Sequence, residues 1–115
     1  MKPAEDKYMN QFAKTQQPPY YAAVFTSVRT AADDGYAKTA EKMVALASEQ
    51  PGFLGVESVR EAGGLGITVS YWKDKESIRK WKNHAAHQQA QQFGRDKWYR
   101  SFKIRVAKVD KEYGI

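Results

Sequence analysis

Residues 53–72 read FLGVESVREAGGLGITVSYW, and this stretch decides the fold. Two runs rich in aromatic and β-branched residues, 53–61 and 65–72, lie on either side of the turn signal AGG at 62–64. Residues of these types favour strands, and so short a glycine-rich link joins neighbouring strands in an antiparallel pair. We therefore predict a β-hairpin in the middle of the chain.

Helical patterns flank this hairpin on both sides. In the first, apolar residues recur at spacings of three and four from Tyr36 to Ala47, behind a predicted N-cap at Asp33-Asp34, and Pro51-Gly52 ends the helix. The second begins at Asp74 or Lys75 and continues to about Phe93. The sequence therefore predicts one helix before the hairpin and one after it.

The first and last strands in chain order are predicted at residues 20–29 and 98–109, where apolar residues alternate with polar or charged ones. The order β-α-β-β-α-β defines an α+β, ferredoxin-like fold, with a four-stranded antiparallel sheet and both helices on one face. Residues 1–19 are polar and end in Pro18-Pro19, so we interpret them as an N-terminal arm that docks on its own domain or on a partner subunit, or as an ill-ordered terminus. Residues 20–115 form the single folded domain.

The first strand is apolar on both faces. Tyr21, Ala23 and Phe25 are nearly as apolar as the even-numbered set of the same strand. Two helices can cover only one face of the sheet, and a large apolar face is rarely left in water. We therefore expect a homodimer in which two sheets pack face to face.

Composition excludes several classes of protein. The 115 residues carry 19 basic and 13 acidic side chains, a formal net charge of +6, but the two signs are interspersed as on an ordinary soluble surface. The absence of cysteine excludes disulfides, thiolate metal sites and a cysteine nucleophile. Residues 1–14 are too polar for a signal peptide, and no apolar run is long enough for a membrane span. We expect a cytoplasmic protein without a membrane partner.

Sequence motifs exclude further functions. The chain has no phosphate-binding glycine loop and no Gly-x-Ser-x-Gly elbow, so neither a nucleotide site nor a serine hydrolase is indicated. The same strand and helix order occurs in RNA-recognition domains, but their third strand carries aromatic residues that stack on bases. Here that strand reads GLGITVSYW (64–72), aliphatic where aromatics are needed, so we expect no nucleic-acid partner.

The second helix carries the candidate chemistry. Ile78, Trp81 and Ala85 define its core-facing stripe, His84 lies at the edge of that stripe, and His87 points further toward solvent. Two histidines at this spacing, with no acid between them and no third ligand in view, do not predict a metal site. From composition alone His84 is better explained by a helix-edge imidazole that bonds a neighbour.

The ordered set of motifs resembles the antibiotic biosynthesis monooxygenase family. The resemblance runs from Tyr20 to Gly114 and rests on YYAAVFT (20–26), QPGFLGV (50–56), SYW (70–72), Trp81-x-x-His84-x-x-His87-x-x-Ala90 and Gly94-Arg95-x-x-Trp98-Tyr99-x-x-Phe102. It implies a dimeric α/β-barrel built from ferredoxin-like protomers. Members of the family include cofactor-free oxygenases that turn phenolic polyketides into quinones, and haem-degrading oxygenases.

The haem-degrading branch fits this chain less well. Its enzymes use an Asn on the first strand, a Trp on the second helix and a haem-ligating His about ten positions later. Trp81 matches the Trp, but the ligand position falls at Gln91 and the first strand offers Thr26-Ser27. The resemblance therefore favours no cofactor, with haem as the alternative.

We accordingly expect a cofactor-independent monooxygenase that oxidises a small aromatic, phenolic or enolisable substrate with O₂. Such chemistry needs a base and a dry pocket that stabilises an anion. The expected catalytic residues are His84, as the base, and Trp81; Trp72 and Phe25 complete an aromatic wall, and Arg95 or Tyr99 holds the anion. The alternative outside the enzymes is a non-catalytic dimer that binds a small aromatic ligand.

Overall fold

The computed structural model describes residues 12–30, 36–92 and 99–115, apart from the side chains of residues 37, 39 and 87–92. Its elements follow the predicted order, which confirms the ferredoxin-like α+β class. They are β1 (Tyr20–Arg29), α2 (Tyr36–Ser48), β2 (Phe53–Arg60), β3 (Leu65–Trp72), α3 (Lys75–Gln92) and β4 (Tyr99–Val109). The N-cap predicted at Asp33-Asp34 lies outside the described residues.

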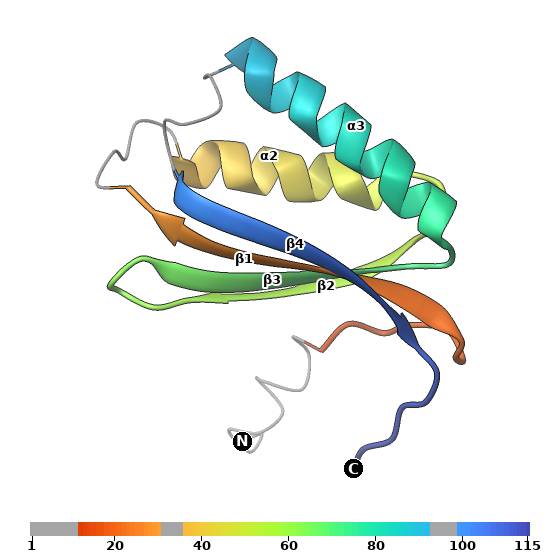
Figure 1. Ribbon diagram of the computed structural model, residues 1–115. Coiled ribbons are helices and arrows are strands. Elements are labelled where there is room, and N and C mark those ends of the chain that lie inside the picture. Colours follow the sequence, from red (N-terminus) through yellow and green to blue (C-terminus); the bar gives the residue numbers. More distant parts are fainter. Residues whose placement is uncertain (1–11, 31–35, 93–98) are drawn as a thin grey trace, which may run out of the picture.

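The four strands form one antiparallel sheet in the order β2-β3-β1-β4. Both helices lie on one side of it, and the C-terminal tail and the described part of the N-terminal arm lie on the other (Figure 1). The first and third strands occupy the centre because each helix carries the chain across a neighbouring strand before it returns to the sheet. The side of the sheet that faces the helices is called the helix side below, and the opposite side the open face.

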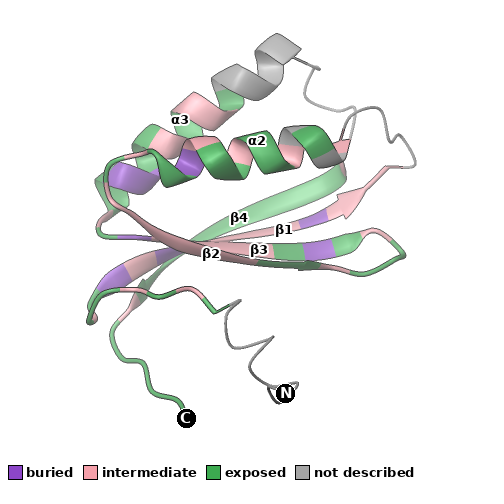
Figure 2. Ribbon diagram, turned by 180° about the vertical axis from the view of Figure 1, so that it is seen from behind, coloured by how far each residue is buried: buried purple, intermediate pink, exposed green. Residues whose placement is uncertain are grey.

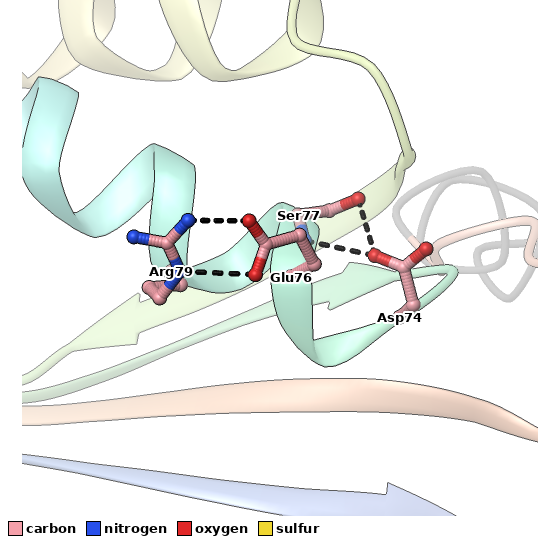
Figure 3. A network of polar contacts seen from close by, with 4 residues as sticks. All are labelled: Asp74, Glu76, Ser77 and Arg79. Carbon is pink, nitrogen blue, oxygen red and sulfur yellow. Dashed lines mark hydrogen bonds and ion pairs between the residues drawn. The ribbon is translucent and has the colours of Figure 1, made fainter.

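A capped turn fixes the start of α3. The Asp74 carboxylate accepts hydrogen bonds from the Ser77 hydroxyl at 2.7 Å and from the Ser77 backbone N–H at 2.8 Å (Figure 3). This is the bonding of an N-cap residue, so the second helix begins where the sequence predicted it. One turn on, Arg79 pairs with Glu76 on the exposed surface.

The register of the sheet decides which face each residue of β1 uses. Tyr21 pairs with Trp72, and Phe25 pairs with Thr68, so the odd-numbered residues of β1 share the helix side with Trp72. Trp72 has no exposed surface, and it forms the core together with the buried side chains of Ala47 and Ile78. The core therefore sits where the beginning of α3 and the end of α2 meet the sheet at the end of β3.

The open face is covered at one end and bare at the other. Tyr20 lies at the covered end, where only 4% of it is exposed and its hydroxyl donates to Glu112 of the C-terminal tail. The described part of the N-terminal arm lies there too, since the backbone N–H of Ala13 donates to Glu57. At the bare end Val59 is 73% exposed and Ile67 43%. Residues 12–19 thus lie against their own sheet.

Candidate functional site

Three aromatic side chains stack along the helix side at the beginning of α3. The rings of Trp72 and Trp81 are stacked with centroids 6.2 Å apart, and His84 lies 5.7 Å beyond Trp81. Trp72 is fixed from below by an edge contact with Phe53 at 5.4 Å, and its indole N–H donates to the Ser70 hydroxyl. These ring contacts run from the buried core to the half-buried His84, so the imidazole lies against rigidly packed aromatic side chains.

His84 carries an unusual atom. Its Nε2 is buried and has no hydrogen-bond partner among the described residues. Leaving a polar atom buried without a partner costs free energy, so nearly all such atoms are paired in native proteins. An imidazole nitrogen in this state keeps its capacity for a hydrogen bond to a molecule that displaces the side chains covering it. The geometry therefore sets His84 apart from an ordinary helix-edge imidazole.

A second aromatic group lies on the same side of the sheet, near the end of β1. Phe25 contacts Tyr99 at 5.4 Å and Phe102 at 5.5 Å between ring centroids. The Tyr99 hydroxyl lies 3.2 Å from that of Tyr36. Burial raises the pKa of Tyr99, and the hydrogen bond to Tyr36 adds to that effect. Tyr99 is therefore a neutral hydroxyl throughout the physiological range.

The exposure of the apolar row on β4 was not anticipated from the sequence. Phe102, Ile104 and Val106 face the helix side, since they pair with the odd-numbered residues of β1. They are nonetheless 43–49% exposed, and β4 is open to solvent along most of its length (Figure 2). The helices leave this row uncovered because, after Trp81, the described part of α3 offers only alanines as apolar residues. That composition was the signal in the sequence that could have revealed the uncovered row.

The structure brings some of the predicted site residues together and separates others. Trp72, Trp81 and His84 form one stack, whereas Phe25 and Tyr99 belong to the second group. Within the described part of the chain no ring contact joins the two groups. Arg95, the other residue expected to hold an anion, lies outside the described residues. The residues predicted to form one aromatic wall are thus divided between two groups on one side of the sheet: Trp72 and Trp81 in the first, and Phe25 in the second.

Across residues 12–30, 36–92 and 99–115, no three His, Asp or Glu side chains gather as a metal-ion site would require. No helix in the part of the chain that the structure describes is long and apolar enough to span a membrane.

The fold places the chain in a class of small α+β proteins with solved structures. It matches SnoaB, a cofactor-independent oxygenase from Streptomyces nogalater, with a TM-score of 0.57 and 14% identity, over 85% of this chain and 98% of that one. It matches MhuD from Mycobacterium tuberculosis, a haem degrader with two haems in its active site, with a TM-score of 0.54 and 18% identity, over 81% and 99%. At these identities the likeness is one of fold.

The amino-acid sequence shows the family as well as the fold. The model of the antibiotic biosynthesis monooxygenase family matches residues 19–92, and the chain belongs to this family. A relative from Bacillus subtilis (strain 168), the uncharacterized protein YqjZ, is 57% identical over 104 residues, which cover 90% of this chain and 91% of that protein. The family resemblance seen in the sequence is therefore confirmed.

Proposed function

We propose that the protein is a cofactor-independent monooxygenase that oxidises a small phenolic or enolisable aromatic substrate with O₂. The observation that carries the proposal is the buried, unpartnered Nε2 of His84, whose ring lies tilted against Trp81 in a chain of an oxygenase family. Support also comes from SnoaB, a fold neighbour that is itself a cofactor-independent oxygenase.

The reaction needs no metal or flavin because the substrate is the reductant. His84 removes a proton from an activated CH₂ or phenol OH, and the resulting anion transfers one electron to O₂. The substrate radical and superoxide combine to a peroxide, which takes up a proton. At a substrate CH₂, or at a phenol ring carbon that carries a hydrogen, the peroxide then loses water and leaves a C=O group. One O₂ is consumed, one of its atoms enters the product, and the other leaves as water.

Each residue of the proposed site has a separate part. Trp81 contacts the substrate ring and keeps water from the anion, while Trp72 has no exposed surface and supports Trp81 from below. Phe25 and the uncovered row of β4 form an apolar floor for the rest of the substrate. The neutral Tyr99 hydroxyl donates a hydrogen bond to the developing oxyanion. Arg95 is the proposed second anion-binding group.

Haem, the cofactor of the alternative reaction, does not fit the residues of β1. The Ser27 side chain is 1% exposed, and its hydroxyl accepts a hydrogen bond from Arg60 at 2.6 Å. Thr26 pairs with Ile67 and therefore faces away from the helices. Neither side chain is placed to contact a group bound between α3 and the sheet, so no step of the proposed reaction uses haem.

Oxygen uptake tests the proposal. The purified protein is treated exhaustively with a chelator and offered a panel of hydroquinones and anthrones under ¹⁸O₂, with protein-free samples as the control for autoxidation. We expect catalysed uptake that survives chelation, with one ¹⁸O atom in the product. Binding of the panel without uptake would make the protein a non-catalytic ligand-binding module instead.

A haem titration of the same sample examines the alternative. We expect no stoichiometric complex with an axial-ligand absorption band. A one-to-one complex that consumes haem in the presence of a reductant, together with no uptake on the aromatic panel, would replace the proposed reaction by haem degradation.

A further inference from the structure

Arg60 is a cation held in a fixed place at the end of β2. Its Nη2 donates to the Ser27 hydroxyl at 2.6 Å, and its Nη1 donates to the backbone carbonyls of Ser27 and Gly64. The guanidinium lies flat on Gly66, where a Cβ atom would be only 2.6 Å from Cζ of Arg60. These contacts come from two other strands, β1 and β3, and from the hairpin turn, so the guanidinium is positioned before any ligand arrives.

Two N–H groups of the Arg60 guanidinium form no hydrogen bond with the described residues. A guanidinium has five N–H groups, and the three bonds to Ser27 and Gly64 use three of them. No carboxylate among the described residues forms an ion pair with Arg60. A positioned guanidinium whose remaining N–H groups meet no acid is suited to take a planar, two-oxygen anion.

A cavity of about 520 Å³ opens beside this group, at the hairpin turn on the left of Figure 1. Its lining consists of Arg29, Thr30, Arg60, Glu61, Ala62, Gly63 and Gly64. Two of these residues are cationic and one, Glu61, is anionic. The Glu61 carboxylate lies over the turn, 3.2 Å from the place that a Cβ of Gly63 would take. Arg60 is thus the cation of the lining whose hydrogen bonds go to the uncharged groups of Ser27 and Gly64.

Aromatic rings stand next to the cations. The Arg29 guanidinium lies 3.5 Å from the centroid of the Tyr36 ring. The Arg60 guanidinium lies 5.9 Å from the Tyr36 ring and 6.0 Å from the Tyr99 ring. A ligand whose anionic group meets Arg60 would thus find two aromatic rings within reach of its own apolar part.

We propose that this cavity binds the carboxylate of a small aromatic acid, with Arg60 as the bidentate partner and Tyr36 and Tyr99 as neighbours of the ring. The inference rests on the proposed function, because Tyr99 belongs both to the proposed oxygenase site and to this cavity. An acidic substrate or product of the oxygenase would therefore lie with its carboxylate at Arg60. The experiment below measures binding of the carboxylate and not oxygen uptake. Failure of this proposal and failure of the proposed oxygenase activity are therefore distinguishable.

Titration with benzoate, followed by calorimetry and by amide chemical shifts, measures this binding at constant ionic strength. We expect saturable binding to the wild type, with shifts centred on residues 60–64, and binding at least tenfold weaker in Arg60→Gln. The charge-matched control is Arg79→Gln on the exposed face of α3, which should bind benzoate like the wild type. Cyclohexanecarboxylate should bind more weakly than benzoate if the tyrosine rings take part.

Arg60 also joins three strands, so Arg60→Gln can fail to fold. Glu61→Gln removes the negative charge from the lining without touching the anchors of Arg60, and it should tighten benzoate binding by about threefold to tenfold. No saturable binding by the wild type, or equal affinity in the wild type and Glu61→Gln, overturns the proposal. Shifts spread over the whole surface, or shifts that inorganic phosphate reproduces at equal concentration, overturn it as well, because they indicate attraction to net charge alone.

Discussion

Asp74 shows how one side chain both starts a helix and makes its stability depend on pH. The hydrogen bond from the Ser77 hydroxyl and the one from the Ser77 backbone lower the pKa of this carboxyl. A carboxyl whose pKa is lower in the folded protein stabilises the fold above its unfolded pKa of about 3.9, and this stabilisation is lost as the pH falls through the folded value.

Two substitutions at this position separate the hydrogen bonds from the charge. Asp74→Ala removes both bonds, so we expect its melting temperature to be several degrees below that of the wild type at pH 7 and close to it near pH 2. Asp74→Asn keeps an N-cap of nearly equal quality without a titrating group. Because it lacks the charge that strengthens both bonds, its melting temperature should lie between those of Asp74→Ala and the wild type at pH 7, and it should fall less on acidification. A constant gap between Asp74→Ala and the wild type at all pH values would contradict this account.

At the scale of elements, the turn from α2 into β2 depends on one glycine. Gly52 has a φ of +87°, and a Cβ atom there would overlap the Ser77 hydroxyl oxygen at the start of α3. Its carbonyl also accepts a hydrogen bond from the backbone N–H of Lys73 at 2.8 Å. The turn therefore locks the end of one helix to the beginning of the other, and it does so only with glycine at this position.

Replacing Gly52 tests that statement. Gly52→Ala should lower the free energy of unfolding by about 1–3 kcal/mol, because it adds backbone strain and a clash with Ser77. Gly63→Ala is the control, since Gly63 has no positive φ and its Cβ would meet only the flexible Glu61 side chain. That variant should remain within about 0.5 kcal/mol of the wild type in urea unfolding. Equal losses in the two variants would contradict the proposed role of the turn.

Elements were easier to predict than the surfaces between them. The hairpin could be predicted because alternating residues and a glycine turn are local signals, and the bounds of β1 and β3 agree with the prediction. The stack of Trp72 with Trp81 depends on how far α3 lies above the sheet, which no local pattern contains. The anchoring of Arg60 by Ser27 was equally hidden, since it joins residues 33 positions apart. Spacing on a helix could suggest His84 as a candidate base, but it could not reveal that its Nε2 is buried without a hydrogen-bond partner.

At the scale of the whole molecule, the bare end of the open face bears on assembly. Val59, Leu65 and Ile67 gather there, with 43–73% of their surfaces exposed. The arm and the tail occupy the other end of this face, next to Tyr20 and Glu57. An apolar patch of this kind on one sheet is suited to pack against the same patch on a second copy. The homodimer expected from the sequence therefore remains our prediction, with the bare end as its centre.

Sedimentation at micromolar concentration measures this assembly. The wild type should sediment at about twice 13.1 kDa. Ile67→Lys places a charge on the bare end and should give a monomer at the same concentration. Val44→Lys is the matched control, because Val44 is 44% exposed on α2, on the opposite side of the sheet, and this variant should remain dimeric. A monomeric wild type would contradict the prediction.

The central claim is that His84 removes the proton that allows O₂ to react, and the rate of oxygen uptake by two histidine variants tests it most directly. His84 and His87 lie one turn apart on α3, so each substitution by alanine changes the same helix and the same kind of side chain. His84→Ala should lower the turnover of a responsive substrate by about 10²–10⁴-fold with little change in melting temperature, as for the loss of a general base. His87→Ala should turn over at the wild-type rate. Equal rates in the wild type and His84→Ala would contradict the account, because they would leave the proposed reaction without its base.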